Sequence, residues 1–173
     1  MKDAMAEPIP PPDPPPHLRL PDFPLPPYRF VPGLNPHPFR HPDGHMYTDG
    51  SAPAEETWDP AVAWESDRAW LRGMDLFDHR FYWEAHEAWE AIWHSVPRDD
   101  PYAELLQGLI QAAAFLLKQH MGHEAAAARL RSVCLGRLED VQERCGSPWK
   151  GVGLDRQIAA LQRGTDDPWP LLG

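Results

Sequence analysis

One histidine and two glutamates lie close together in a segment that is rich in tryptophan. The segment, residues 81–93, reads FYWEAHEAWEAIW. His86 and Glu90 are four residues apart, so on a helix they share a face and could both bind one divalent cation, such as Zn²⁺. Glu87 lies about 100° further round the helix and is a candidate general base. This pattern fits a metal-dependent hydrolase in which a bound cation activates water.

His86 and Glu90 are expected to point toward the protein interior. A helical wheel groups them with the large apolar residues of 81–93, including Trp93, and places Glu84 on the opposite side. A buried imidazole and a buried carboxylate must find polar partners or change their protonation. The pair therefore marks a structural polar cluster, a small-molecule pocket or a metal site, and the sequence leaves all three open.

Two glutamines on the next long segment are the expected partners of this pair. Residues 101–120 are apolar over most of the helical circumference, and Gln107 and Gln111 lie on the one narrow polar line. A helix of this kind is central in a bundle. Because amide side chains both donate and accept hydrogen bonds, we expect the two glutamines to face His86 and Glu90 across the core.

Arg137 lies within the apolar stripe of a later helix and is a further candidate for the polar layer. An arginine there needs an acid, and Glu90 or Glu87 could accept a bidentate, charge-assisted pair. Alternatively, its aliphatic stem covers the core and its guanidinium reaches water. The sequence does not decide between the two.

Known motifs limit the chemistry. The zincin signature His-Glu-x-x-His would need a histidine at position 90, where the chain has Glu90. The di-iron motif Glu-x-x-His would need a glutamate at position 83, where the chain has Trp83. The chain also has no CxxC pair, glycine-rich phosphate loop or nucleophile elbow, which excludes zinc ribbons, P-loop nucleotide sites and that class of acyl transferase.

A second set of histidines, His37, His41 and His45, also has a spacing of four residues. Pro38 and Pro42 forbid a helix here, so this spacing does not bring the rings together. In extended chain successive members would lie about 13 Å apart, too far to share an ion unless the chain folds back. Turn and packing roles are therefore favoured over metal binding.

The composition limits which binding partners and which cellular location are expected for the protein. The chain of 173 residues has a formal net charge of −10 and no block rich in lysine and arginine, which argues against nucleic acid and against an anionic membrane surface. No apolar stretch is long enough to span a bilayer, and no signal-peptide core follows the first residues, so we expect a cytoplasmic protein. Cys134 and Cys145 are eleven residues apart on one expected helix and are interpreted as core thiols.

Proline divides the chain, because 16 of its 22 prolines lie before residue 54. Residues 1–27 are expected to be a proline-rich, disordered or extended, solvated tail, with binding to an adaptor module as the alternative. Residues 28–54 add aromatics and are expected to form an extended strap that packs on the bundle. Its aromatic contacts would come from Tyr28, Phe30, Phe39 and Tyr47. Residues 55–173 are expected to form the helical bundle domain.

Apolar periodicity and helix breakers predict five helices in that domain. The expected ranges are 60–77, with Asp59 as N-cap, then 80–95, 101–120, 123–144 and 154–163. The connections are short and no strand pattern competes. The predicted fold class is an all-α, up-and-down helical bundle of four to five helices with a proline-rich extended N-terminal segment.

The tryptophan-rich segment and the segment after it resemble a known family. The matching runs are LF at 76–77, FYWEAHEAWEAIW at 81–93 and LQGLIQAAA at 106–114. Together with VPG at 31–33, HP at 37–38 and GH at 44–45, they are similar over roughly residues 28–145 to the family called domain of unknown function 309. The resemblance implies a small helical bundle without an assigned activity. The positions that align with the family pattern are His86, Glu87, Glu90, Trp93, Gln107 and Gln111.

Three functions remain open from the sequence, which does not decide whether the protein is an enzyme. The first is a helical protein whose His/Glu/Gln layer is structural or binds a small ligand. The second is a metal-dependent hydrolase with His86 and Glu90 as ligands. The third is an interaction scaffold that acts through the proline-rich tail. Eight tryptophans would also suit a homodimer face, since large aromatics are enriched at interfaces.

Overall fold

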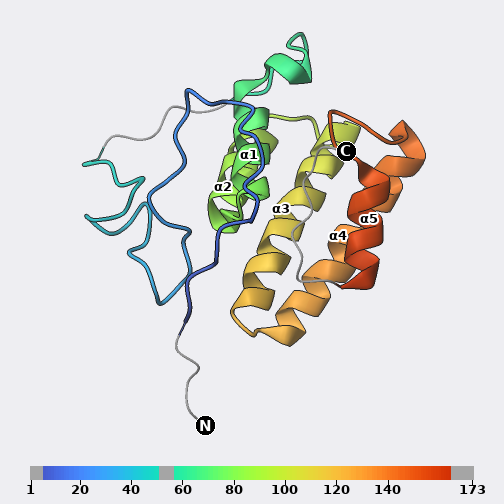
Figure 1. The fold of residues 1–173 in the computed structure, drawn as a ribbon. Helices are drawn as coiled ribbons and strands as arrows, with labels where there is room; N and C mark the ends of the chain where they lie inside the picture. Colours follow the sequence, from blue (N-terminus) through green and yellow to red (C-terminus); the bar gives the residue numbers. More distant parts are fainter. Residues whose placement is uncertain (1–5, 51–56, 165–173) are drawn as a thin grey trace.

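The computed structural model describes residues 6–50 and 57–164, and over these ranges the protein is all-α without a named strand (Figure 1). One 3₁₀ turn and five helices follow each other: η1 (Trp64–Ser66), α1 (Arg68–Asp78), α2 (Tyr82–Trp93), α3 (Pro101–His120), α4 (Glu124–Cys145) and α5 (Leu154–Arg163). Each helix packs on the next one in the chain. The predicted all-α fold class is confirmed. No helix of the described residues is long and apolar enough to cross a membrane.

Side-chain caps fix where two helices begin. At α3, the Asp100 carboxylate accepts a hydrogen bond from the backbone N–H of Tyr102 at 2.8 Å, and Pro101 occupies the first helical position. At α1, Asp67 accepts from the N–H of Trp70 at 3.0 Å. The predicted start of this helix at residue 60 is wrong, because the Asp59 carboxylate instead accepts from Ala61 N–H and closes a turn.

The link between α1 and α2 is a Schellman motif. The N–H of Phe81 donates to the carbonyl of Leu76 at 2.8 Å, and the N–H of Arg80 donates to the carbonyl of Phe77 at 2.9 Å. Arg80 has φ +64°, the left-handed conformation that glycine normally supplies at this position.

The core includes residues of all five helices, and between α1, α2 and α3 it contains a cluster of aromatic rings. Trp70 contacts Trp89 and Tyr102, with ring centroids 5.9 and 5.5 Å apart, and Trp89 contacts Phe77 at 5.6 Å. Gly73 on α1 faces the Trp89 indole so closely that a Cβ at this position would overlap the ring. The close approach of α1 to α2 therefore requires glycine.

The N-terminal segment, residues 6–50, contains no helix or strand and runs beside α1 and α2, coloured blue to cyan in Figure 1. Its buried side chains include Ile9, Leu20 and Val31. Phe30 and Phe39 both contact the Trp83 ring, at 5.1 and 5.5 Å between centroids. Tyr47, which was also expected to pack on the helices, is 41% exposed.

Candidate functional site

The histidine and the two glutamates of α2 form a compact triad. His86 Nδ1 lies 3.4 Å from Glu87 Oε1 and 4.0 Å from Glu90 Oε2. One potential ligand atom from each residue lies within 4.8 Å of the others, and within the described chain this is the single group of its kind. His86 Nδ1 is buried and has no hydrogen-bond partner. The side chains are half-buried, with exposed fractions of 29% for His86, 28% for Glu87 and 41% for Glu90.

The prediction that His86 and Glu90 point into the core, with Glu84 outside, is wrong. The fully buried stripe of α2 consists of Ala85, Trp89 and Ile92, rotated by roughly a quarter turn from the predicted face. The histidine and its neighbouring acids consequently lie at the edge of the buried face.

The predicted amide layer does not form. Gln107 and Gln111 are half-buried on α3, and no hydrogen bond among the described residues joins either of them to His86 or Glu90. Gln111 instead accepts a hydrogen bond from Arg137 Nε at 3.1 Å. Gln111 therefore belongs to the contact between α3 and α4 and not to the triad.

Arg137 forms its ion pair with a different acid from those predicted. Its Nη1 donates to Glu104 Oε1 of α3 at 2.6 Å, so neither Glu87 nor Glu90 is its partner. Both members of the Arg137–Glu104 pair are about one quarter exposed, which corresponds to neither a core ion pair nor a fully solvated one. Trp93, the last predicted member of the layer, is half-buried and carries the Arg98 guanidinium 3.5 Å above its ring centroid.

The three histidines of the N-terminal segment have separate roles. His37 Nδ1 and His41 Nδ1 accept hydrogen bonds from the backbone N–H two residues later, at 3.3 and 3.1 Å, which stabilises turns. His45 is buried and its Nε2 lies 2.9 Å from Glu84 Oε1. The favoured turn and packing roles agree with these contacts.

Glu84 is the buried acid that the sequence analysis missed. It is 2% exposed, and besides His45 its Oε1 accepts from the backbone N–H of Phe30 at 3.0 Å. Its second oxygen, Oε2, is buried and has no hydrogen-bond partner. The helical wheel could not identify this residue, because its cover comes from the N-terminal segment and not from another helix.

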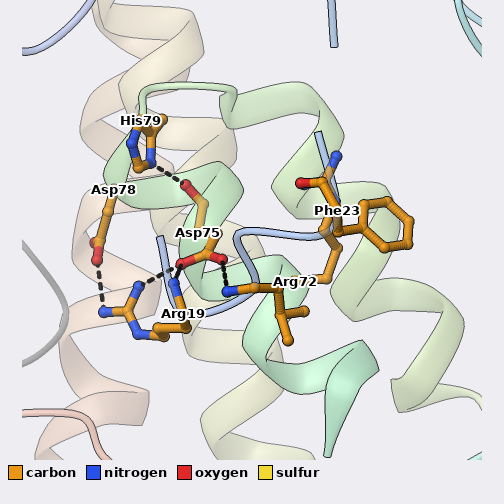
Figure 2. A network of polar contacts seen from close by, with 7 residues as sticks. Arg19, Phe23, Arg72, Asp75, Asp78 and His79 are labelled. Carbon is orange, nitrogen blue, oxygen red and sulfur yellow. Dashed lines mark hydrogen bonds and ion pairs between the residues drawn. The ribbon is translucent and has the colours of Figure 1, made fainter. Parts of the chain in front are cut away.

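A second missed cluster attaches the N-terminal segment to α1 (Figure 2). Asp75 is fully buried, and its carboxylate accepts hydrogen bonds from the backbone N–H groups of Arg19 and Leu20, both at 2.9 Å. The Arg19 guanidinium bridges Asp75 at 3.0 Å and Asp78 at 2.7 Å. His79 Nδ1 lies 2.8 Å from the backbone carbonyl of Asp75. This cluster is a structural attachment, since its carboxylates are occupied by protein donors.

Comparison with known proteins agrees with the resemblance seen in the sequence. Residues 70–130 match the family described as Domain of unknown function (DUF309). No curated protein and no solved structure was found to match the chain. The matching range contains all of α2 and α3, and with them the triad and both glutamines. The similarity to the DUF309 family therefore rests on this part of the chain.

Proposed function

We propose that this protein binds one divalent cation through His86, Glu87 and Glu90. The observation that carries the proposal is the convergence of one nitrogen and two carboxylate oxygens on one face of α2. The ligand atoms of a tetrahedral Zn²⁺ site are about 3.4 Å apart, as bond lengths near 2.1 Å require. The 3.4 Å between His86 Nδ1 and Glu87 Oε1 matches this separation, and Glu90 Oε2 at 4.0 Å needs a small side-chain rotation to do so.

The donor set also suits a cation. An imidazole with two carboxylates is a combination used for Zn²⁺, Mn²⁺ and Fe²⁺, and three protein ligands leave a coordination position for water or a ligand. His86 Nδ1 is buried without a hydrogen-bond partner, so its lone pair in the neutral ring is available. The half-buried position of the triad gives a small molecule access to the open coordination position.

The reaction class that such a site would support is hydrolysis, in which the cation lowers the pKa of bound water. In the hydrolase suggested by the sequence, Glu87 is the base and His86 and Glu90 are the ligands. The geometry favours Glu87 as a ligand, because its Oε1 is nearer to His86 Nδ1 than the Glu90 carboxylate is. The proposal therefore assigns all three residues of the triad to cation binding and assigns no residue as general base.

Metal titration of the full-length, chelator-treated protein tests the proposal. We expect about one equivalent of Zn²⁺ or Mn²⁺ to bind, measured by calorimetry and by elemental analysis after gel filtration. His86→Ala and Glu90→Gln should each weaken binding by at least about tenfold, since each removes one ligand. Uptake of less than a tenth of an equivalent of every cation tried would refute a metal function.

Matched variants keep the test specific to the triad. His94→Ala removes an exposed histidine just after α2, and Glu143→Gln removes an exposed acid from α4. Neither should change metal uptake. Because the triad side chains are partly exposed, their substitution should alter the free energy of unfolding of the metal-free protein by only about 0.5 kcal/mol.

A further inference from the structure

A cavity of about 540 Å³ lies at the N-terminal end of α2. Its walls come from the start of α2, the end of α3, the start of α4 and the N-terminal segment around Ile9. This volume falls within the range of about 300–1,000 Å³ that is typical of small-molecule sites. None of the triad residues lines the cavity, so its function is independent of the metal proposal.

Arg80 lines the cavity from the left-handed position of the Schellman motif. A residue other than glycine there costs about 1 kcal/mol of backbone strain, which an arginine side chain must offset by what it contacts. Its Nη1 donates to the carbonyl of Pro10 at 3.2 Å, and its Nε is buried without a partner. No carboxylate of the described residues forms an ion pair with Arg80, so within this part of the chain its positive charge has no acidic partner.

A second guanidinium increases the positive potential beside the cavity. Arg29 Nε donates a hydrogen bond to the carbonyl of His79 at 2.8 Å. The guanidinium carbon of Arg29 lies 4.3 Å from the centroid of the Phe81 ring. Burial, and then the nearby charge of Arg80, lower the pKa of Arg29, while Glu84 opposes this effect. Since the Glu84 carboxylate is already bound to His45, an anion in the cavity would relieve the repulsion between the two arginines.

Tyr82 supplies a hydrogen-bond donor to the same cavity. The residue is 5% exposed and lines the cavity at the start of α2. Burial raises the pKa of Tyr82 to about 12, so at neutral pH its hydroxyl keeps the proton that it can donate. The remaining lining includes the apolar Leu116 and Ile9, which are both buried, and the acidic Glu124 at the start of α4.

We propose that this cavity binds a small organic carboxylate, whose anionic head lies between the Arg80 guanidinium and the Tyr82 hydroxyl. The apolar body of the ligand packs on Leu116 and Ile9, which supply the hydrophobic contribution to affinity. A single guanidinium and a hydroxyl suit a monoanion, because a charge-assisted hydrogen bond from each satisfies one carboxylate oxygen. The negative charge of Glu124 disfavours a phosphate dianion in the same space.

Binding of three simple probes to the full-length, chelator-treated protein tests this proposal. Hexanoate carries the carboxylate and an apolar chain, hexan-1-ol carries the chain alone, and inorganic phosphate is an anion without a chain. By calorimetry or ligand-observed NMR we expect hexanoate to bind at least about tenfold more tightly than either of the others. Equal binding of hexanoate and hexan-1-ol, tighter binding of phosphate, or no binding of hexanoate at millimolar concentration would each overturn the proposal.

Two variants place the ligand in this cavity. Arg80→Asn removes the charge, and asparagine tolerates the left-handed backbone, so hexanoate affinity should fall about tenfold with the fold retained. Tyr82→Phe keeps the ring and should reduce affinity about fivefold through loss of one hydrogen bond.

Lys150→Asn is the matched control. Among the residues that the structure describes, Lys150 is the other non-glycine residue with positive φ, at +47°. It does not line the cavity, so this variant should bind hexanoate as the wild type does. Unchanged affinity in both Arg80→Asn and Tyr82→Phe, with far-UV circular dichroism showing the native helix content, would exclude this cavity as the site.

Discussion

Glu84 and His45 form the most deeply buried polar contact between the N-terminal segment and α2. Both side chains are at most 5% exposed, and the carboxylate also accepts the backbone N–H of Phe30. A buried donor that loses its acceptor costs the full free energy of its desolvation. The pair therefore contributes to stability chiefly because its removal would leave two donors unsatisfied.

Glu84→Ala should destabilise the protein by about 2–3 kcal/mol, because it leaves the N–H groups of Phe30 and His45 without an acceptor. Urea unfolding followed by tryptophan fluorescence measures this change, and Trp83, which packs on Phe30, reports the same contact. Glu143→Ala, at an exposed position of α4, is the control and should change stability by less than about 0.5 kcal/mol. Equal effects of the two substitutions would show that the Glu84 contacts are unimportant.

Cys134 should be far less reactive than Cys145 toward iodoacetamide in the native protein. Cys134 is fully buried, and burial raises the pKa of its thiol to about 12, whereas Cys145 is half-buried at the end of α4. The reactive species is the thiolate, which Cys134 does not form near neutral pH. Mass spectrometry of the labelled peptides, with urea-unfolded protein as the control, distinguishes the two; faster labelling of Cys134 would contradict its burial.

The same raised pKa makes stability depend on alkaline pH. The folded state keeps the Cys134 proton up to about pH 12, while the unfolded state loses it from about pH 9, so the unfolded state binds fewer protons between these values. The free energy of unfolding should therefore fall as the pH rises through this window. Cys134→Ala should make the pH dependence shallower, whatever its effect at neutral pH; an unchanged slope would assign the loss to other groups.

At the scale of the elements, α1 and α2 are held together by a glycine that contacts a tryptophan. A methyl group at position 73 would overlap the Trp89 indole, which is itself fully buried. Because protein interiors are close-packed, the neighbouring rings cannot move aside without strain. The spacing of the two helices, and with it the orientation of the triad on α2, depends on this contact.

Gly73→Ala should destabilise the protein by about 1–3 kcal/mol, despite the higher helix propensity of alanine. Gly136→Ala on α4 is the matched control, because a Cβ there meets nothing within 4 Å. That substitution should stabilise the protein by up to about 1 kcal/mol. Thermal unfolding of both variants measures the difference, and stabilisation by both would refute the close contact at Gly73.

At the scale of the whole molecule, residues 6–50 cover the helices α1 and α2 without forming secondary structure. Asp75 attaches this segment by accepting three hydrogen bonds, two of them from the backbone. Arg68 on the same helix also contacts the segment, through Asp22 at 2.8 Å, but both members of this pair are more than half exposed. The buried and the exposed attachment allow a direct comparison.

Asp75→Ala should cost about 3 kcal/mol or more, because it leaves two backbone N–H groups near the core without their acceptor and removes one of the two carboxylates that pair with Arg19. Arg68→Ala should cost less than about 1 kcal/mol, as is usual for an exposed ion pair. Limited proteolysis should cut the N-terminal segment of Asp75→Ala much faster than that of wild type or Arg68→Ala. Equal proteolysis of all three proteins would show that Asp75 does not hold the segment.

The sequence determined the helices and the local grouping of the triad. The ranges predicted for α3 and α5 are confirmed to the residue, and α2 and α4 differ by one or two residues, because apolar periodicity, proline and glycine act over a few neighbouring positions. His86, Glu87 and Glu90 came together for the same reason, since one helical turn brings them close. The start of α1 was wrong because an aspartate can cap a turn as well as a helix.

Only the tertiary structure decided which face of α2 is buried. Glu84 is covered by residues 39 and 54 positions earlier in the chain, and helical periodicity contains no information about such distant contacts. Likewise, the acid that pairs with Arg137 was fixed by how α3 and α4 pack, which brought Glu104 to it in place of Glu87 or Glu90. Local propensity sets the helices, whereas the free energy of packing sets their rotation about their own axes, and that rotation determines which polar side chains are buried.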